Sequence, residues 1–332
     1  MEKIKKNVIL LLIIGFLILA LVLKDDFYGI IDVLLNANKG YIVIGIMIFI
    51  IGDLFKSISI TNIIKEQKKE YKYKNGFLLV LETNFFNGIT PFSLGGQPFQ
   101  LYTLKKKNKI DYVTGANVLF KDFYTYQMAL VILSTICLCL GYRYSVLIFS
   151  NGMKQLILIG FAVNFIISLF LIYLPYSKKN GKVIVTGFIT FLTKLKLVKN
   201  KDEKISEIND YISNFKTQIN KIIVNPKLIF SSILLNIIKL ISLGVVTYFC
   251  FRSVDSNVPL LSSLVISILI ITMASFVPIP GASGGMEFGF ITLFSYYVID
   301  AKLSATMLIW RFLTYYLPII YGAIITVIEG RK

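Results

Sequence analysis

The sequence predicts an all-α polytopic membrane protein with six full spans and two re-entrant hairpins of broken helices, arranged as an inverted repeat. The chain has 332 residues, of which 56% are hydrophobic and only 16% are charged, and its mean hydropathy is +0.73. Soluble domains carry about a quarter charged residues. The apolar residues here form runs close to the ~20 residues that cross a bilayer, which excludes the soluble, fibrous and disordered classes.

Uninterrupted apolar runs predict the full spans at residues 7–23, 40–63, 112–140, 154–175, 228–251 and 303–328. The first run follows a basic start, as a secretory signal does, but no small-residue cleavage site comes after it, so we expect a retained helix. Segment 176–227 is polar, and the spacing of its isoleucines predicts a cytoplasmic insertion of amphipathic helices. This insertion is too short to form an enzyme domain of its own.

Two further apolar stretches, 76–104 and 260–299, are interrupted by segments rich in Pro and Gly. If both stretches return to the side from which they enter, most Lys and Arg residues fall on the side of the two termini. Cytoplasmic loops carry such an excess, so two hairpins and cytoplasmic termini are favoured. A full crossing by the second stretch remains the alternative.

The predicted elements occur in the same order in both halves of a single membrane domain, 1–332. Residues 1–140 contain span, span, hairpin and span, and residues 154–332 contain the same order from the opposite face. The breaks also match, because both have the pattern Pro-x-x-x-Gly-Gly, at 91–96 and 280–285. Inverted repeats whose broken helices meet at mid-bilayer recur in transporters. The alternative is coincidence, since Gly and Pro are common in membrane helices.

Composition excludes several kinds of chemistry. The net charge is +17, but the Lys and Arg residues lie in short clusters between apolar runs, which is typical of topology signals and not of a nucleic-acid surface. The chain has no histidine, and its three cysteines lie inside apolar runs. These features argue against a disulfide framework, a metal site and histidine-based catalysis. We therefore expect no catalytic residue, no metal and no other cofactor.

The two breaks are the predicted ligand site. A half-helix begins after each Gly-Gly pair, and its free amide groups and positive dipole end favour an anion. Glycine also permits close approach of a ligand to the backbone. We predict a lipid-headgroup site formed by Thr90, Ser93, Gly95, Gly96, Gln97, Gln100, Lys121, Ser283, Gly284 and Gly285. The alternative is that the breaks only allow the helices to pack tightly.

Charged residues inside apolar runs are costly in lipid and are therefore functional candidates. Glu287 and Arg311 are predicted to form a charge pair at mid-depth, either as a structural pair or as a moving gate. Asp53 and Lys56 lie three residues apart on one helix face, so they are placed to neutralise each other.

Three segments of the chain carry a family resemblance: 83–102 (TNFFNGITPFSLGGQPFQLY), 278–287 (PIPGASGGME) and 310–316 (WRFLTYY). They resemble the two signatures and the start of the last helix of the lysylphosphatidylglycerol synthase transmembrane region, also called the flippase-like domain family. The resemblance implies a multi-pass protein of the bacterial cell membrane. It also implies binding and translocation of an anionic or aminoacylated phospholipid or a lipid-linked phosphate, which in the larger multiple peptide resistance factors contributes to antibiotic resistance.

Those larger members also carry a soluble domain that transfers lysine from lysyl-tRNA to phosphatidylglycerol. The sequence ends at Lys332, directly after its last predicted helix, so this transfer and its nucleic-acid partner are not expected. Phosphatidylglycerol lysyltransferase remains the alternative that the family name implies. A second alternative is a non-transporting membrane partner of an envelope glycosyltransferase. The expected partner is a membrane phospholipid or lipid-linked phosphate, with an envelope-synthesis enzyme as the alternative.

Overall fold

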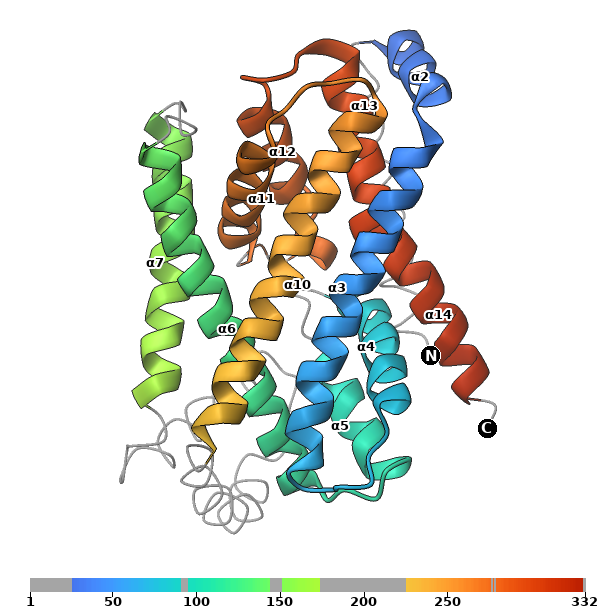
Figure 1. Ribbon diagram of the computed structural model, residues 1–332, viewed down its shortest axis with the longest axis vertical. Helices are drawn as coiled ribbons and strands as arrows, with labels where there is room; N and C mark the ends of the chain where they lie inside the picture. Colours follow the sequence, from blue (N-terminus) through green and yellow to red (C-terminus); the bar gives the residue numbers. More distant parts are fainter. Residues whose placement is uncertain are drawn as a thin grey trace, which may run out of the picture.

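Helices make up all of the regular structure in the described part of the chain. The computed structural model describes residues 26–90, 95–143, 151–173, 225–275, 277 and 279–330 (Figure 1). The predicted span 7–23, and the predicted insertion up to residue 224, lie outside these ranges.

Five helices are long and apolar enough to cross a membrane. They are α3 (Lys39–Lys65), α6 (Tyr112–Arg143), α7 (Asn151–Tyr173), α10 (Pro226–Ser253) and the continuous helix Asp300–Gly330. The last one consists of α13 (Asp300–Arg311), the π-helical turn η5 (Phe312–Tyr316) and α14 (Leu317–Gly330). These five helices coincide with the predicted spans from 40–63 onward. A short helix, α2 (Phe27–Asn36), precedes α3 and was not predicted.

Polar caps define where several of these helices begin. The side chain of Asn38 accepts a hydrogen bond from the Gly40 amide at the start of α3, and Asn225 accepts one from Leu228 at the start of α10. Asn is a preferred N-cap residue because its side-chain oxygen satisfies an amide that has no partner within the helix. The amide of Thr114 likewise donates to Asp111, just before α6. Partial burial raises the pKa of the Asp111 carboxyl, but hydrogen bonds from Thr114 and from the backbone amides of Asp111 and Val113 together outweigh it and hold the pKa below its usual range.

Each interrupted stretch forms a pair of short helices. The first pair is α4 (Tyr73–Gly88) and α5 (Gly96–Lys106), and the second is α11 (Leu260–Ala274) and α12 (Gly285–Phe294), with the turn η4 (Pro280–Ala282) between them. At 1.5 Å per residue even α4 is only about 24 Å long, short of the ~30 Å hydrocarbon core. In Figure 1, α4 and α5 occupy the lower half of the bundle, and α11 and α12 the upper half.

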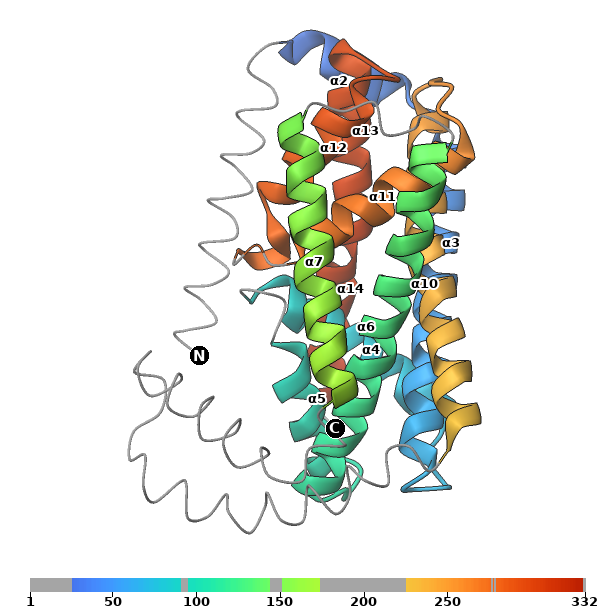
Figure 2. The ribbon, with the colours of Figure 1, turned by 90° about the vertical axis from the view of Figure 1, so that its left-hand side faces the viewer.

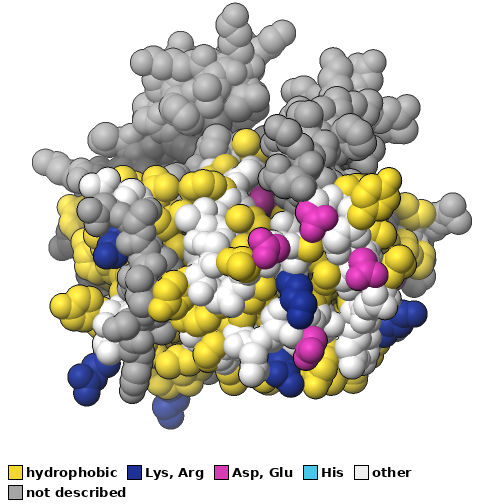
Figure 3. All heavy atoms as spheres, turned by 90° about the horizontal axis from the view of Figure 1, so that it is seen from above, with side chains coloured by type: hydrophobic (Ala, Val, Ile, Leu, Met, Phe, Trp, Pro, Cys, Tyr) yellow, Lys and Arg dark blue, Asp and Glu magenta, His cyan; other side chains and the backbone are white. Residues whose placement is uncertain are grey.

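The two ends of the bundle differ in charge. We call the lower end of Figure 1, where α3 ends and α10 begins, the basic end. Its loops and helix ends carry Lys65, Lys68, Lys69, Lys72, Lys74, Lys105, Lys106, Lys107, Lys109 and Lys227. Figure 3 views the opposite end, where scattered charged side chains of both signs lie among hydrophobic and uncharged groups.

The packing has a central helix pair and an aromatic core. Helices α3 and α10 run side by side, and Gly52 allows the close approach, because a Cβ at this position would lie 2.1 Å from Oγ of Ser242. In the upper half, the fully buried rings of Phe251, Phe290 and Phe294 pack together and join α10 to α12. Large apolar side chains such as Met47, Ile166 and Ile324 remain exposed on α3, α7 and α14, as expected of lipid-facing surfaces.

Helix α7 lies at the outside of the bundle, against α6 and α11 (Figure 2). Its residue Gly160 touches the backbone of α11, since an added Cβ would lie 2.7 Å from Cα of Met273. One turn later, the amide nitrogen of Asn164 donates to the carbonyl of Thr272 at 3.1 Å. This carbonyl lies in the last turn of α11, where carbonyls lack a partner within the helix. The same carbonyl also accepts from Oγ of Ser275, the C-cap residue of α11, at 2.9 Å, so helix α7 supplies a second donor to the end of the broken helix.

This contact predicts a difference between two glycines of α7. Gly160→Ala should lower the free energy of unfolding by about 1–3 kcal/mol, because the new methyl group meets backbone atoms that cannot rotate away. Gly152→Ala is the matched control, because no atom lies within 4 Å of a Cβ at that position. Thermal unfolding of the two variants in detergent measures the difference. Equal unfolding midpoints would show that the α7–α11 contact is not close.

Candidate functional site

The second break is a tight turn with unusual backbone geometry. Gly281, Ala282 and Gly284 have positive φ angles of 62°, 50° and 86°. Glycine adopts this conformation readily, whereas at Ala282 it costs roughly 1–2 kcal/mol. Such strain persists only where the surroundings fix the backbone, often at functional sites. One fixing contact is the hydrogen bond from the Gly284 amide to Oε2 of Glu287, at 2.7 Å, which places a carboxylate at the N-terminus of α12.

Arg311 holds this turn from the last position of α13. Its Nε donates to Oε1 of Glu287 at 2.5 Å, and its Nη2 donates to Oγ of Ser283 at 3.0 Å and to the carbonyl of Gly281 at 3.2 Å. Arg311 is 3% exposed and Glu287 is 6% exposed, so the pair is shielded from solvent. The guanidinium also lies 4.5 Å from the ring centroid of Tyr315. The structure thus pairs Glu287 with Arg311 and gives the guanidinium two further acceptors in the turn.

The first break is closed by its own side chains. Oγ1 of Thr90 donates to the carbonyl of Phe86 at 2.7 Å and accepts from the amide of Gly95 at 2.8 Å. The amide of Gly96, the first residue of α5, donates to Oδ1 of Asn87 at 2.9 Å. A Cβ at Gly95 would lie 2.7 Å from the carbonyl oxygen of Phe86, so this turn has no room for a larger residue.

Tyr315 connects the two breaks. Its hydroxyl donates to the carbonyl of Gly88, the last residue of α4, at 2.9 Å. Its ring lies against Gly281 in the second break, where an added Cβ would be 2.0 Å from Cε2 of the tyrosine. Tyr315 belongs to the π-helical turn that follows Arg311, and π turns inside α-helices are frequent at functional sites. The ends of the two hairpins therefore meet around one tyrosine.

The predicted site residues that the structure describes fall into three groups. Those at the breaks are Thr90, Gly95 and Gly96 in the first and Ser283, Gly284, Gly285, Glu287 and Arg311 in the second. On α5, beyond the first break, Gln97 is exposed and Gln100 is buried. Lys121 forms an ion pair with Glu66, the C-cap residue of α3, at the basic end. Ser93 lies outside the described residues.

The amide groups expected to face a ligand already have acceptors. Those of Gly95, Gly96 and Gly284 donate to side chains of the protein itself. An anion at either break would have to replace these internal acceptors.

One sequence prediction about charge is wrong. Asp53 and Lys56 do not neutralise each other, because each pairs with a neighbouring helix. Asp53 pairs with Lys239 of α10 at 2.8 Å, and Lys56 pairs with Asp122 of α6 at 2.6 Å. Helices α10 and α6 both pack on α3 and offer partners of opposite charge, which the spacing along α3 alone does not reveal.

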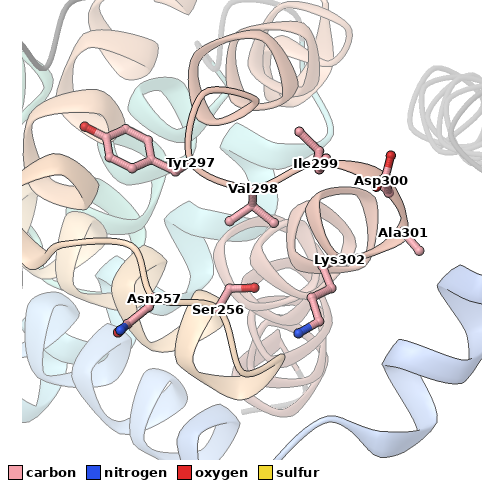
Figure 4. A pocket seen from close by; sticks show the side chains of 8 residues that line it. All are labelled: Ser256, Asn257, Tyr297, Val298, Ile299, Asp300, Ala301 and Lys302. Atoms are coloured by element: carbon pink, nitrogen blue, oxygen red, sulfur yellow. The ribbon is translucent and has the colours of Figure 1, made fainter.

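A separate hollow of about 460 Å³ lies at the opposite end, away from the breaks (Figure 4). It is lined by Ser256, Asn257, Tyr297, Val298, Ile299, Asp300, Ala301 and Lys302. Three of its polar side chains are engaged within the protein: Asn257 accepts from Arg252, Tyr297 donates to Ser262 and Lys302 donates to the Asp255 carbonyl.

The bridge between the breaks predicts a stability effect. Tyr315→Phe should lower the free energy of unfolding by about 1–3 kcal/mol, because the buried carbonyl of Gly88 loses its donor. Tyr296→Phe is the control, since that side chain is 60% exposed. Thermal unfolding in detergent compares the two variants. If Tyr315→Phe unfolds like the wild type, the hydroxyl does not join the hairpins.

Comparison with known proteins agrees with this architecture. Residues 7–322 match the family described as the lysylphosphatidylglycerol synthase TM region. The chain is also 28% identical, over 339 residues, to a UPF0104 membrane protein of Methanocaldococcus jannaschii, and the match covers 99% of this chain and 97% of that protein. The family match includes both breaks and Arg311. The protein is thus a membrane protein that belongs to the lysylphosphatidylglycerol synthase transmembrane-region family.

Proposed function

We propose that the protein binds the anionic headgroup of a phospholipid, or of a lipid-linked phosphate, at the two breaks and moves the lipid across the membrane. The observation that carries the proposal is the junction of the two hairpins, where Tyr315 touches both breaks beside the buried Arg311. Irregular backbone at membrane depth is tolerated where it is buried in protein or lines a cavity, and broken helices of this kind hold substrate sites in transporters.

In this proposal, Glu287 occupies the place of the headgroup in the unliganded protein. Its carboxylate accepts hydrogen bonds from the amide of Gly284 at the start of α12 and from Arg311. A helix N-terminus and a guanidinium are the donors that a phosphate group uses. An incoming phosphate would replace the carboxylate, and Arg311 would keep a negatively charged partner throughout. Glu287 and Arg311 then act as the gate, and Ser283 as a further headgroup donor.

The proposal includes the inverted repeat. The pair α4–α5 occupies the half of the bundle next to the basic end, and α11–α12 occupies the other half. The positive-inside rule assigns the basic end to the cytoplasm, so the hairpins would enter from opposite leaflets. A junction of this kind is where access can alternate between the two sides. The family description, which names lysylphosphatidylglycerol, supports a phosphate-containing lipid as the substrate.

Lipid movement in reconstituted vesicles tests the proposal. Vesicles with the protein should move acyl-labelled phosphatidylglycerol between leaflets faster than protein-free vesicles, measured by quenching of the outer leaflet. Arg311→Lys should slow this movement by about tenfold, a loss of about 1.4 kcal/mol, because lysine lacks the planar fork that holds both Glu287 and Ser283.

Arg252→Lys is the control for the loss of an arginine, because Arg252 bonds to Asn257 at the opposite end, away from the breaks. Labelled lysylphosphatidylglycerol and phosphatidylcholine show whether the headgroup charge matters. If none of the labelled lipids moves faster than in protein-free vesicles, the proposal is contradicted.

A further inference from the structure

A buried network that the headgroup site does not use lies halfway along the bundle. Its centre is Asp53, which is 1% exposed and lies at the midpoint of α3. Oδ1 of Asp53 pairs with Lys239 at 2.8 Å, and Lys239 lies at the midpoint of α10. Oδ2 accepts hydrogen bonds from Nδ2 of Asn84 at 2.9 Å and from the hydroxyl of Tyr321 at 2.6 Å. This carboxylate therefore joins α3, α4, α10 and α14.

Such a pair contributes little to stability. Removing two charges from water costs several kcal/mol per ion, and well-packed apolar residues often replace buried ion pairs without loss. Ionisable residues inside a membrane protein commonly mark pathways for ions or protons. The carboxylate of Asp53, at the centre of this network, thus fits a group that takes up and releases a proton during function.

From this geometry we infer that Asp53 and Lys239 form a proton-exchange site that couples lipid movement to a proton gradient. The coupling to lipid movement rests on the proposed function. The proton site itself can be tested independently of lipid movement. A proton from one side of the membrane forms an O–H bond at Oδ1 of Asp53 and breaks the ion pair, while Lys239 keeps its protons. Release to the other side restores the pair.

The surroundings of Lys239 are compatible with both the charged and the neutral form of Asp53. Its Nζ lies 4.0 Å from the ring centroid of Phe49, so a cation–π contact remains when the carboxylate is neutral. The site then carries one net positive charge, which offsets the negative charge of a phosphodiester headgroup. The other titratable group bonded to Asp53 is Tyr321 of α14, while α4 contributes the amide of Asn84.

The same helices connect this site to the breaks. Asn84 lies one turn before Gly88 on α4, and Tyr321 follows Tyr315 in the same continuous helix. Close packing holds these helices together, because a Cβ at Gly322 would lie 2.5 Å from the carbonyl oxygen of Leu81. A change in the hydrogen bonds of Asp53 therefore acts on α4, which ends at the first break, and on the continuous helix that carries Arg311 and Tyr315.

Further charged groups lead from this site toward the basic end. One turn along α3, Lys56 pairs with Asp122 of α6 and also donates to Asn236 of α10 at 3.2 Å. Near the end of α3, Lys121 pairs with Glu66. From Lys56 to Glu66 is ten residues along α3, about 15 Å. These ion pairs place polar groups at intervals between the basic end and Asp53.

Two measurements on the purified full chain test the inference, with Asp53→Asn as the variant. Infrared difference spectra between about pH 5 and about pH 8 should show a protonated carboxyl band in the wild type that is absent from the variant. Asp32→Asn is the matched control and should leave this band intact, because Asp32 is exposed and bonds to Asn36 within α2. A spectrum in which Asp53→Asn removes no band overturns the proton site.

The second measurement uses vesicles with labelled phosphatidylglycerol, with and without a gradient of about one pH unit, a tenfold difference in proton activity. The gradient should change the wild-type rate by at least about threefold and leave the rate of Asp53→Asn unchanged. If the wild-type rate does not depend on the gradient, the coupling is overturned, but the proposed function still stands. If no labelled lipid moves, the proposed function and the coupling both fail, and the infrared band alone decides the proton site.

The double variant Asp53→Asn/Lys239→Met guards against misfolding, because it leaves no unpaired charge in the bundle. It should lose the infrared band and move lipid at a rate indifferent to the gradient. A double variant that retains the band or responds to the gradient like the wild type also overturns the inference.

Discussion

A helix that stops inside a membrane leaves amide and carbonyl groups that lipid cannot satisfy. Many contacts in this structure supply hydrogen-bond partners for such groups. The carbonyl of Gly88 at the end of α4 accepts a hydrogen bond from the hydroxyl of Tyr315, and that of Thr272 near the end of α11 accepts one from the side-chain amide of Asn164. At the start of α12, the amide of Gly284 donates a hydrogen bond to the carboxylate of Glu287. These partners come from other helices or from the break itself, so the packing of the bundle and the integrity of the breaks depend on each other.

The same contacts explain how a closed junction could serve lipid movement. The amides of Gly95, Gly96 and Gly284 donate to side-chain oxygens, and a phosphate can replace the Glu287 carboxylate without leaving the Gly284 amide unsatisfied. In the proposed function, a headgroup would therefore exchange with these internal acceptors without loss of the junction. In the proposed coupling, the buried pair of Asp53 and Lys239 would add a second exchangeable contact, on helices that end at, or pass through, this junction.

Hydropathy and Pro-Gly patterning predicted much of the fold, because both signals are local. The spans from 40–63 onward and the two interrupted stretches appear as helices near their expected bounds. The two Gly-Gly pairs lie at the starts of α5 and α12, and Glu287 pairs with Arg311 of the last span, while their role in binding a headgroup stays a prediction. Local patterns could not find partners distant in sequence. Tyr315 bonds to a carbonyl 227 residues away, and Lys239 pairs with a carboxylate 186 residues away. The predicted pairing of Asp53 with Lys56 failed for the same reason.

A structure of the protein in nanodiscs that contain phosphatidylglycerol would test the central claim most directly. The account predicts density for a phosphate group within hydrogen-bonding distance of the Gly284 amide and the Arg311 guanidinium, with the Glu287 carboxylate displaced. Lipid density confined to the outer surfaces of α3, α7 and α14, with Glu287 still bound to Gly284 and Arg311, would contradict it.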